Sequence, residues 1–199
     1  MGLASGKHGI SREEIRRMMY GSLRARHYEK RDRRSNVDAD TCRECGGQCC
    51  KRCGCFYSPD DFKDLSFNAM CEEIEKGCIT IELVDLDMLM IGSSYAYGIR
   101  ARNKNGFVVE ERRFRPQGEC VYLTPTGCRL QYEERPANGR LLIPSRYCTS
   151  DGLHVCYSSY GVEESLREWQ LYFDLVMQLV EKYRDFDIPI PTFDSENNP

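Results

Sequence analysis

The sequence predicts an α+β fold: a small, irregular, metal-stapled domain with short β-hairpins, flanked by an N-terminal basic helix and a C-terminal amphipathic helix. Three observations support this prediction: helix signals near both ends of the chain, short alternating apolar stretches with turn residues in the middle, and a dense group of cysteines before them. We divide the 199 residues into a basic helical arm over 1–36, a cysteine-rich metal-binding domain over 37–160, and a C-terminal helix with an extended tail over 161–199.

The arm is predicted from its charge and from a helix start. Residues 1–36 contain ten Lys or Arg and four Asp or Glu, a net charge of +6, whereas the remainder of the chain sums to −9. Ser11-Arg12-Glu13-Glu14 is a capping box, so we expect a helix from there to about Arg34. A basic arm meets nucleic acid, an anionic surface or the chain's own acidic body. Nucleic acid is not favoured here, because the body is acidic and the arm contains few aromatic residues.

The segment after the cysteine cluster predicts helices and then a strand. Ser58-Pro59-Asp60-Asp61 is a helix start with proline at the first helical position, so one or two short helices should fill residues 59–77. In residues 79–91 the apolar positions alternate in one phase and then, from Val84, in the other. A strand with a β-bulge accounts for such a change of phase.

Two hairpins are predicted further on. Apolar residues alternate from Tyr95 to Ala101, the turn residues Asn103-Lys104-Asn105-Gly106 follow, and Phe107-Val108-Val109 completes the pattern of a β-hairpin. A short strand over Cys120-Val121-Tyr122-Leu123 should then turn at Thr124-Pro125-Thr126-Gly127.

Residues 162–186 carry the strongest helical periodicity. Their apolar residues are spaced alternately by three and four positions: Leu166, Trp169, Phe173, Val176, Val180 and Tyr183. We expect this stripe to pack on the domain's own core, and an unknown protein partner, such as a second copy of the chain, is the alternative. The final residues, from Asp187, predict an extended proline-rich tail.

The cysteines point to a metal. No run of about 18 apolar residues and no secretory leader is present, so we expect a cytoplasmic protein without membrane contact, in which thiols stay reduced. Closely spaced thiols in such a compartment indicate zinc, iron or an iron–sulfur cluster. The candidate metal ligands are Cys42, Cys45, Cys49, Cys50, Cys53, Cys55, Cys120, Cys128, Cys148 and Cys156. Cys71 and Cys78 are interpreted as small buried apolar residues.

The motifs resemble a known family. CRECGGQCC, then GECVYLTPTGCRLQYEERP, then a later cysteine are similar to the bacterial cysteine-cluster proteins of the YkgJ type, described as zinc- or iron-chelating domains. The resemblance covers roughly residues 42–160. It implies that Cys42, Cys45, Cys49, Cys50, Cys120 and Cys128 are metal ligands, with Cys148 or Cys156 as the last one.

One position departs from the family pattern. The family has a cysteine in a block that appears here as Arg135-Pro136-Ala137-Asn138-Gly139-Arg140, and Gly139 stands in its place. One ligand of the family is therefore missing or replaced. Cys148, Cys53 and Cys55 are the candidate replacements, and an open coordination position is the alternative.

Three hypotheses for function follow. The first is a metal-binding protein that chelates zinc or iron, with an iron–sulfur cluster as one form of the metal and no defined reaction. The second is a redox or electron-transfer iron–sulfur protein. The third is a zinc-stabilised, nucleic-acid-associated protein that uses the basic arm. Motifs of serine hydrolases, zinc proteases and nucleotide-binding enzymes are absent, so we favour a protein that is not a stand-alone enzyme.

Overall fold

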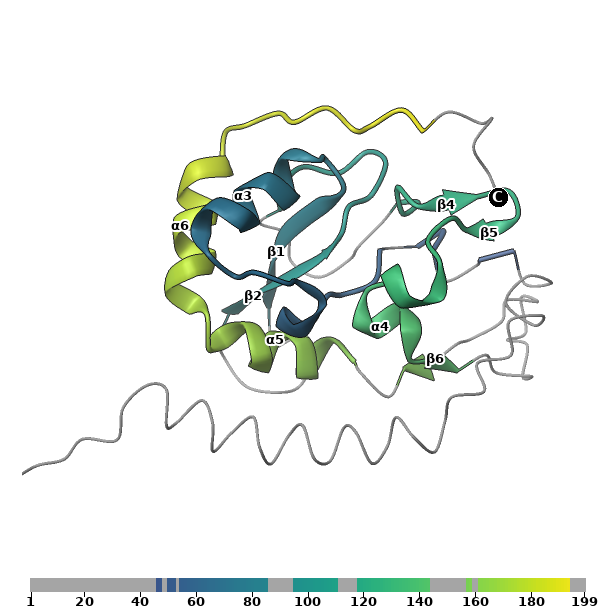
Figure 1. Ribbon diagram of the computed structural model, residues 1–199, viewed down its shortest axis with the longest axis horizontal. Helices are drawn as coiled ribbons and strands as arrows, with labels where there is room; N and C mark the ends of the chain where they lie inside the picture. The colour runs from purple at the N-terminus through teal and green to yellow at the C-terminus, as the bar shows by residue number, and fades with distance from the viewer. Residues whose placement is uncertain are drawn as a thin grey trace, which may run out of the picture. The chain divides into compact units, whose positions relative to one another are not determined.

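The computed structural model describes residues 46, 47, 50–52, 54–85, 95–110, 118–143, 157–158 and 161–193 (Figure 1). The chain divides into two units, Met1–Asn36 and Val37–Pro199, and all described residues belong to the second. The predicted arm helix from Ser11 to about Arg34 lies outside them. The elements are η1 (Pro59–Asp61), α3 (Phe67–Glu75), β1 (Ile79–Asp85), β2 (Tyr95–Ala101), β3 (Val109–Glu110), β4 (Leu123–Thr124), β5 (Gly127–Cys128), η3 (Tyr132–Glu134), α4 (Ala137–Arg140), β6 (Leu142–Ile143), β7 (Tyr157–Ser158), α5 (Val162–Gln170) and α6 (Phe173–Tyr183). This combination of helices and small sheets confirms the α+β class.

The prediction of one or two short helices over residues 59–77 is confirmed, because the structure has η1 and α3 there. The hydroxyl of Ser58 accepts a hydrogen bond from the backbone N–H of Asp60, and the Asp61 carboxylate accepts one from the N–H of Ser58, so η1 begins with a complete capping box. After α3 the chain turns at Gly77, whose φ of 79° is in the left-handed region that favours glycine. A Cβ there would lie 2.4 Å from the carbonyl oxygen of Pro189, so the turn has no room for a side chain.

The largest sheet has the strand order β2-β1-β3. β1 pairs with β2 in a one-to-one antiparallel register from Ile79 opposite Ala101 to Asp85 opposite Tyr95. The predicted bulge is therefore wrong within Ile79–Asp85, while residues 86–91 lie outside the described part of the chain. The apolar phase changes because both faces of β1 are covered. Ile81 is buried in the main core, and Val84 is buried in a second cluster with Phe56 and Leu166.

The predicted hairpin between residues 95–101 and 107–109 is wrong. The chain does turn at Asn103–Gly106, but β3 then pairs in parallel with β1 rather than with β2. A buried charge explains this arrangement. The Arg100 guanidinium on β2 binds Glu82 on β1 at 2.6 Å and Glu110 on β3 at 2.7 Å, so one cation joins all three strands.

The predicted turn before Cys128 is confirmed, but the predicted strand before it is largely wrong. β4 and β5 pair antiparallel around the turn at Pro125 and Thr126. The predicted strand began at Cys120, whereas the structure places Val121 and Tyr122 in a turn and Cys120 in an isolated bridge to Asn103.

The single helix predicted over residues 162–186 is wrong, because the structure has two helices, α5 and α6, separated at Leu171 and Tyr172. The break allows α5 to pack on β2 while α6 lies beside α3 (Figure 1). The stripe packs on the domain's own core, as expected: Leu166, Trp169, Val176, Val180 and Tyr183 are buried, whereas Phe173 is 45% exposed. The tail continues without helix or strand as far as the structure describes it, to residue 193.

Trp169 fixes α5 to the segment that follows the cysteine cluster. Its indole N–H donates to the carbonyl oxygen of Tyr57 at 2.9 Å, and the Ser165 hydroxyl donates to the same oxygen at 2.8 Å. Ser165 and Trp169 are both buried, so these hydrogen bonds lie in the core. Among the described residues, no helix is long and apolar enough to cross a membrane.

Candidate functional site

The structure describes part of the predicted ligand set. Cys50, Cys55, Cys120 and Cys128 lie within the described residues. The other candidates lie outside them: Cys42, Cys45, Cys49, Cys53, Cys148 and Cys156. Cys71 and Cys78 are both buried, as expected for residues that pack as small apolar side chains.

Cys50 and Cys120 are distant in sequence and adjacent in the fold. The backbone N–H of Cys120 donates to the carbonyl oxygen of Cys50 at 2.8 Å. Cys120 is 4% exposed, and Cys50 packs against the main core cluster to which Cys120 belongs. The fold therefore brings the later part of the sequence against the dense cysteine segment.

The turn before Cys50 also contacts the hairpin that carries Cys128. Gly47 has a φ of 72°, and a Cβ at this position would lie 2.7 Å from Leu123 Cδ1 and 3.9 Å from Gly127 Cα. Leu123 pairs with Cys128 across β4 and β5. The positive φ favours glycine at position 47, and a side chain there would also displace the Leu123 methyl group.

Cys55 lies in a second neighbourhood, opposite Gly139. A Cβ on residue 139 would lie 3.3 Å from Cys55 Sγ and 3.5 Å from Cys55 Cβ. Gly139 belongs to the short helix α4, and the N–H of its neighbour Asn138 donates to the carbonyl oxygen of Phe56 at 3.1 Å. The thiol of Cys55 therefore reaches the place where the resembled family has its own cysteine.

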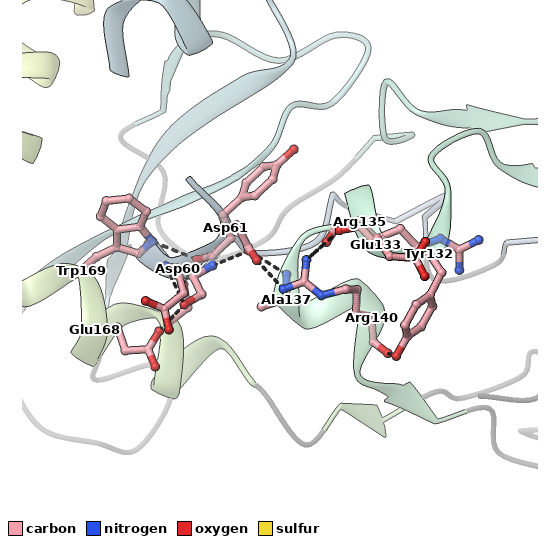
Figure 2. Close-up of polar contacts among 12 residues, drawn as sticks. Asp60, Asp61, Tyr132, Glu133, Arg135, Ala137, Arg140, Glu168 and Trp169 are labelled. Carbon is pink, nitrogen blue, oxygen red and sulfur yellow. Dashed lines mark hydrogen bonds and ion pairs between the residues drawn. The ribbon is translucent and has the colours of Figure 1, made fainter. Parts of the chain in front are cut away.

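A buried carboxylate holds α4 in this position (Figure 2). Asp61 Oδ2 accepts from the N–H of Ala137 at 2.8 Å, and Asp61 Oδ1 pairs with the Arg140 guanidinium. The Asp61 side chain is 4% exposed and that of Arg140 is 21% exposed, so the carboxylate is the more buried partner of the pair. Arg140 also donates to the carbonyl oxygen of Arg135, which closes the segment on itself. The capping box of η1 and the family-like block at 135–140 thus form one polar network.

The end of β2 joins the two neighbourhoods. The N–H of Ala101 donates to the carbonyl oxygen of Cys55 at 2.9 Å, and Asn103 forms an isolated bridge to Cys120. The sequence did not predict that the end of β2 joins these segments. In the sequence, Asn103 resembles an ordinary turn residue and Arg100 resembles a surface charge. Both are buried, with exposures of 1% and 0%.

A cavity of about 710 Å³ lies next to Cys78, and none of Cys50, Cys55, Cys120 and Cys128 lines it. Tyr57, Tyr122 and Cys78 are among the residues that line it. Burial, the largest cause, raises the pKa of Tyr57 well above its usual value and also raises the pKa of Tyr122. Burial raises the pKa of the Cys78 thiol too, although Tyr122 and nearby cations oppose the shift. Cys78 therefore stays protonated near neutral pH, which disfavours a role as a nucleophile.

Within the described ranges, no three side chains among His, Cys, Asp and Glu come together as a ligand set for a metal ion. Comparisons with protein-family models, curated proteins and solved structures found no match to the chain. The fold and its candidate site define an α+β protein in which two cysteine neighbourhoods meet at the end of a buried strand. The resemblance to the cysteine-cluster family rests on the quoted motifs.

Proposed function

We propose that the protein binds zinc or iron through the thiolates of its cysteine cluster, with an iron–sulfur cluster as one form of the bound iron. The observation that carries the proposal is the hydrogen bond between Cys120 and Cys50. Thiolate sites commonly combine a closely spaced pair with ligands from elsewhere in the sequence. This contact supports such a combination, because it places a remote cysteine against the dense segment.

The donor set fits these metals. Thiolate sulfur is a preferred ligand of zinc and of iron–sulfur clusters. Backbone hydrogen bonds join Cys55 to Ala101 at the end of β2 and Cys120 to Cys50, so three of the candidate ligands belong to connected segments. We propose Cys55 as the replacement for the cysteine that the resemblance places at position 139, and its short distance from Gly139 supports this assignment. The bound metal would supply a cross-link between segments distant in sequence, worth roughly 10–16 kcal/mol of apparent folding free energy for zinc in peptides.

The test is metal analysis of the full chain purified anaerobically, combined with its visible spectrum. We expect zinc or iron at a stoichiometric level, and visible absorption only where iron–sulfur is present. Reconstitution of the metal-free protein with each ion is the second arm. A protein that holds neither ion after purification or reconstitution contradicts the proposal.

Serine substitutions identify the ligands. Cys50→Ser and Cys120→Ser should each lower the affinity for the metal, measured by competition with a chromophoric chelator. Cys71→Ser is the matched control, because Cys71 is a buried cysteine on α3 that is not a proposed ligand. If all three variants bind the metal with equal affinity, Cys50 and Cys120 are not its ligands.

A further inference from the structure

Two segments that carry candidate ligands meet at Asn103. Its side-chain oxygen accepts a hydrogen bond from the backbone N–H of Gly54 at 3.2 Å, between Cys53 and Cys55 in the sequence. Its backbone forms a bridge with Cys120, whose own N–H donates to the carbonyl oxygen of Cys50. One buried residue therefore contacts both the dense cysteine segment and the remote cysteine.

Asn103 is itself held by a buried cation. The Arg100 guanidinium donates to Asn103 Oδ1 at 3.1 Å and to the carbonyl oxygen of Ala101 at 3.0 Å. The same guanidinium binds Glu82 and Glu110, both less than 4% exposed. A charge with this many short contacts in the core has little freedom to move, so it fixes the position of the Asn103 amide.

The loop around Gly54 is pressed directly on β2. A Cβ on Gly54 would lie 1.9 Å from the carbonyl oxygen of Ala101 and 2.9 Å from its Cβ. No side chain fits there unless the backbone moves. The hydrogen bond to Asn103 and this close approach act together, since each requires that residue 54 stay against the end of the strand.

We propose that Asn103, held by Arg100, is a positioning residue that preorganises the metal site. The inference rests on the proposed function and deepens it. Neither residue is a metal ligand. They act by holding the backbone of Gly54 against the strand end that also bridges to Cys120, so that less conformational entropy is lost when thiolates close on an ion. Residues that orient the ligands of a metal typically change its affinity 10–100-fold when they are substituted.

The test is Asn103→Ala in the full chain. This substitution removes the acceptor of Gly54 and one acceptor of Arg100 without changing a ligand. The matched control is Ile81→Val, a fully buried change on β1 of the same sheet that has no contact with the cysteine loop in the described hydrogen bonds. Zinc and iron(II) are each titrated against a chromophoric chelator, and thermal unfolding of the metal-free proteins gives the stability lost in each variant.

We expect Asn103→Ala to lower the affinity for the bound ion at least tenfold, while Ile81→Val changes it less than about threefold. Gly54→Ala is the second variant, for the case in which Asn103→Ala does not fold. It leaves the Arg100 network intact and should lower the affinity to a similar degree. Affinities equal to that of Ile81→Val in the variants that fold would overturn the positioning role alone. A wild-type protein that binds neither ion would overturn the proposed function, and the positioning role with it.

Discussion

Gly139→Cys tests the most specific contact in the candidate site. The new Cβ would lie 3.5 Å from Cys55 Cβ, at the short end of the range of about 3.5–4.5 Å that disulfides require. The φ of Gly139 is not in the left-handed region, so the backbone accepts a cysteine. We therefore expect a disulfide between residues 55 and 139 when the metal-free variant is oxidised.

The magnitude follows from the length of the closed loop. The chain between Cys55 and residue 139 contains about 84 residues, for which the chain-entropy model gives a stabilisation of about 4.5 kcal/mol. For a unit of this size that is a rise in melting temperature of about 10–15 °C. The distance of 3.3 Å between the new Cβ and Cys55 Sγ is compatible with a disulfide, in which each Cβ lies close to the sulfur of the other residue.

The assay compares oxidised and reduced protein. Peptide mapping by mass spectrometry should identify a cross-linked pair that contains residues 55 and 139, and thermal unfolding should show the higher melting temperature only in the oxidised form. Gly139→Ser is the control for the added side chain, because it has a similar size and forms no disulfide. The difference in melting temperature between oxidised Gly139→Cys and Gly139→Ser then gives the effect of the cross-link alone.

Two results would refute the reasoning. The first is a disulfide that joins the introduced thiol at position 139 predominantly to a cysteine other than Cys55. The second is a reduced thiol at residue 139 after prolonged oxidation of a variant that is folded by circular dichroism. Either result would mean that Cys55 does not face α4.

Three further predictions concern the metal and two polar contacts. Bound zinc should slow the cross-linking of Gly139→Cys, because a coordinated thiolate at Cys55 is less available for exchange; equal rates with and without zinc would argue against Cys55 as a ligand. Asp61→Ala should lower the free energy of unfolding by about 3 kcal/mol, since it removes the carboxylate that pairs with Arg140 and the acceptor of two backbone N–H groups. Urea unfolding measures this, and a loss below about 1 kcal/mol would contradict the network. The pKa of Glu75 is lowered by hydrogen bonds from Tyr183 and Lys182, so its contribution to stability is present above its unfolded pKa of 4.5 and is lost as the pH falls through the lower folded pKa. Between about pH 6 and about pH 3, the melting temperature of Glu75→Gln should therefore fall less than that of the wild type, and parallel curves would show that this carboxylate is not linked to folding.

Local signals in the sequence predicted the elements that depend on neighbouring residues. The Ser58 cap, the turn between β4 and β5 and the apolar stripe of the C-terminal helices each involve residues a few positions apart. Their physical causes, backbone capping, turn geometry and helical periodicity, act over short distances. They can therefore be recognised without knowledge of the fold.

The elements that the sequence predicted wrongly depend on contacts between distant residues. The pairing of β3 with β1 depends on Arg100, Glu82 and Glu110, and charged residues in a sequence give no sign that they are buried together. The break between α5 and α6 is hidden because the apolar spacing continues across it. It becomes necessary only because one helix packs on β2 and the other on α3.

The candidate site was likewise predicted only in part from the sequence. The spacing of the cysteines identified candidate ligands, and the resemblance identified residue 139 as a position where a cysteine is missing. Neither could identify Cys55 as the residue that faces position 139, because the contact joins segments more than 80 residues apart. The role of Asn103 was equally hidden, since an asparagine near a glycine indicates a turn.

The hydrogen bond between Trp169 and Tyr57 gives the molecule an internal optical reporter. The chain contains a single tryptophan, so all of its indole emission comes from one place, where α5 meets the residue that lies two positions after Cys55. The indole is 1% exposed, and its ring lies 5.8 Å from that of Phe62. Any event that moves the cysteine loop relative to the C-terminal helices must alter the surroundings of this one fluorophore. The wild-type sequence thus carries its own probe of loop movement, with no need for an attached dye.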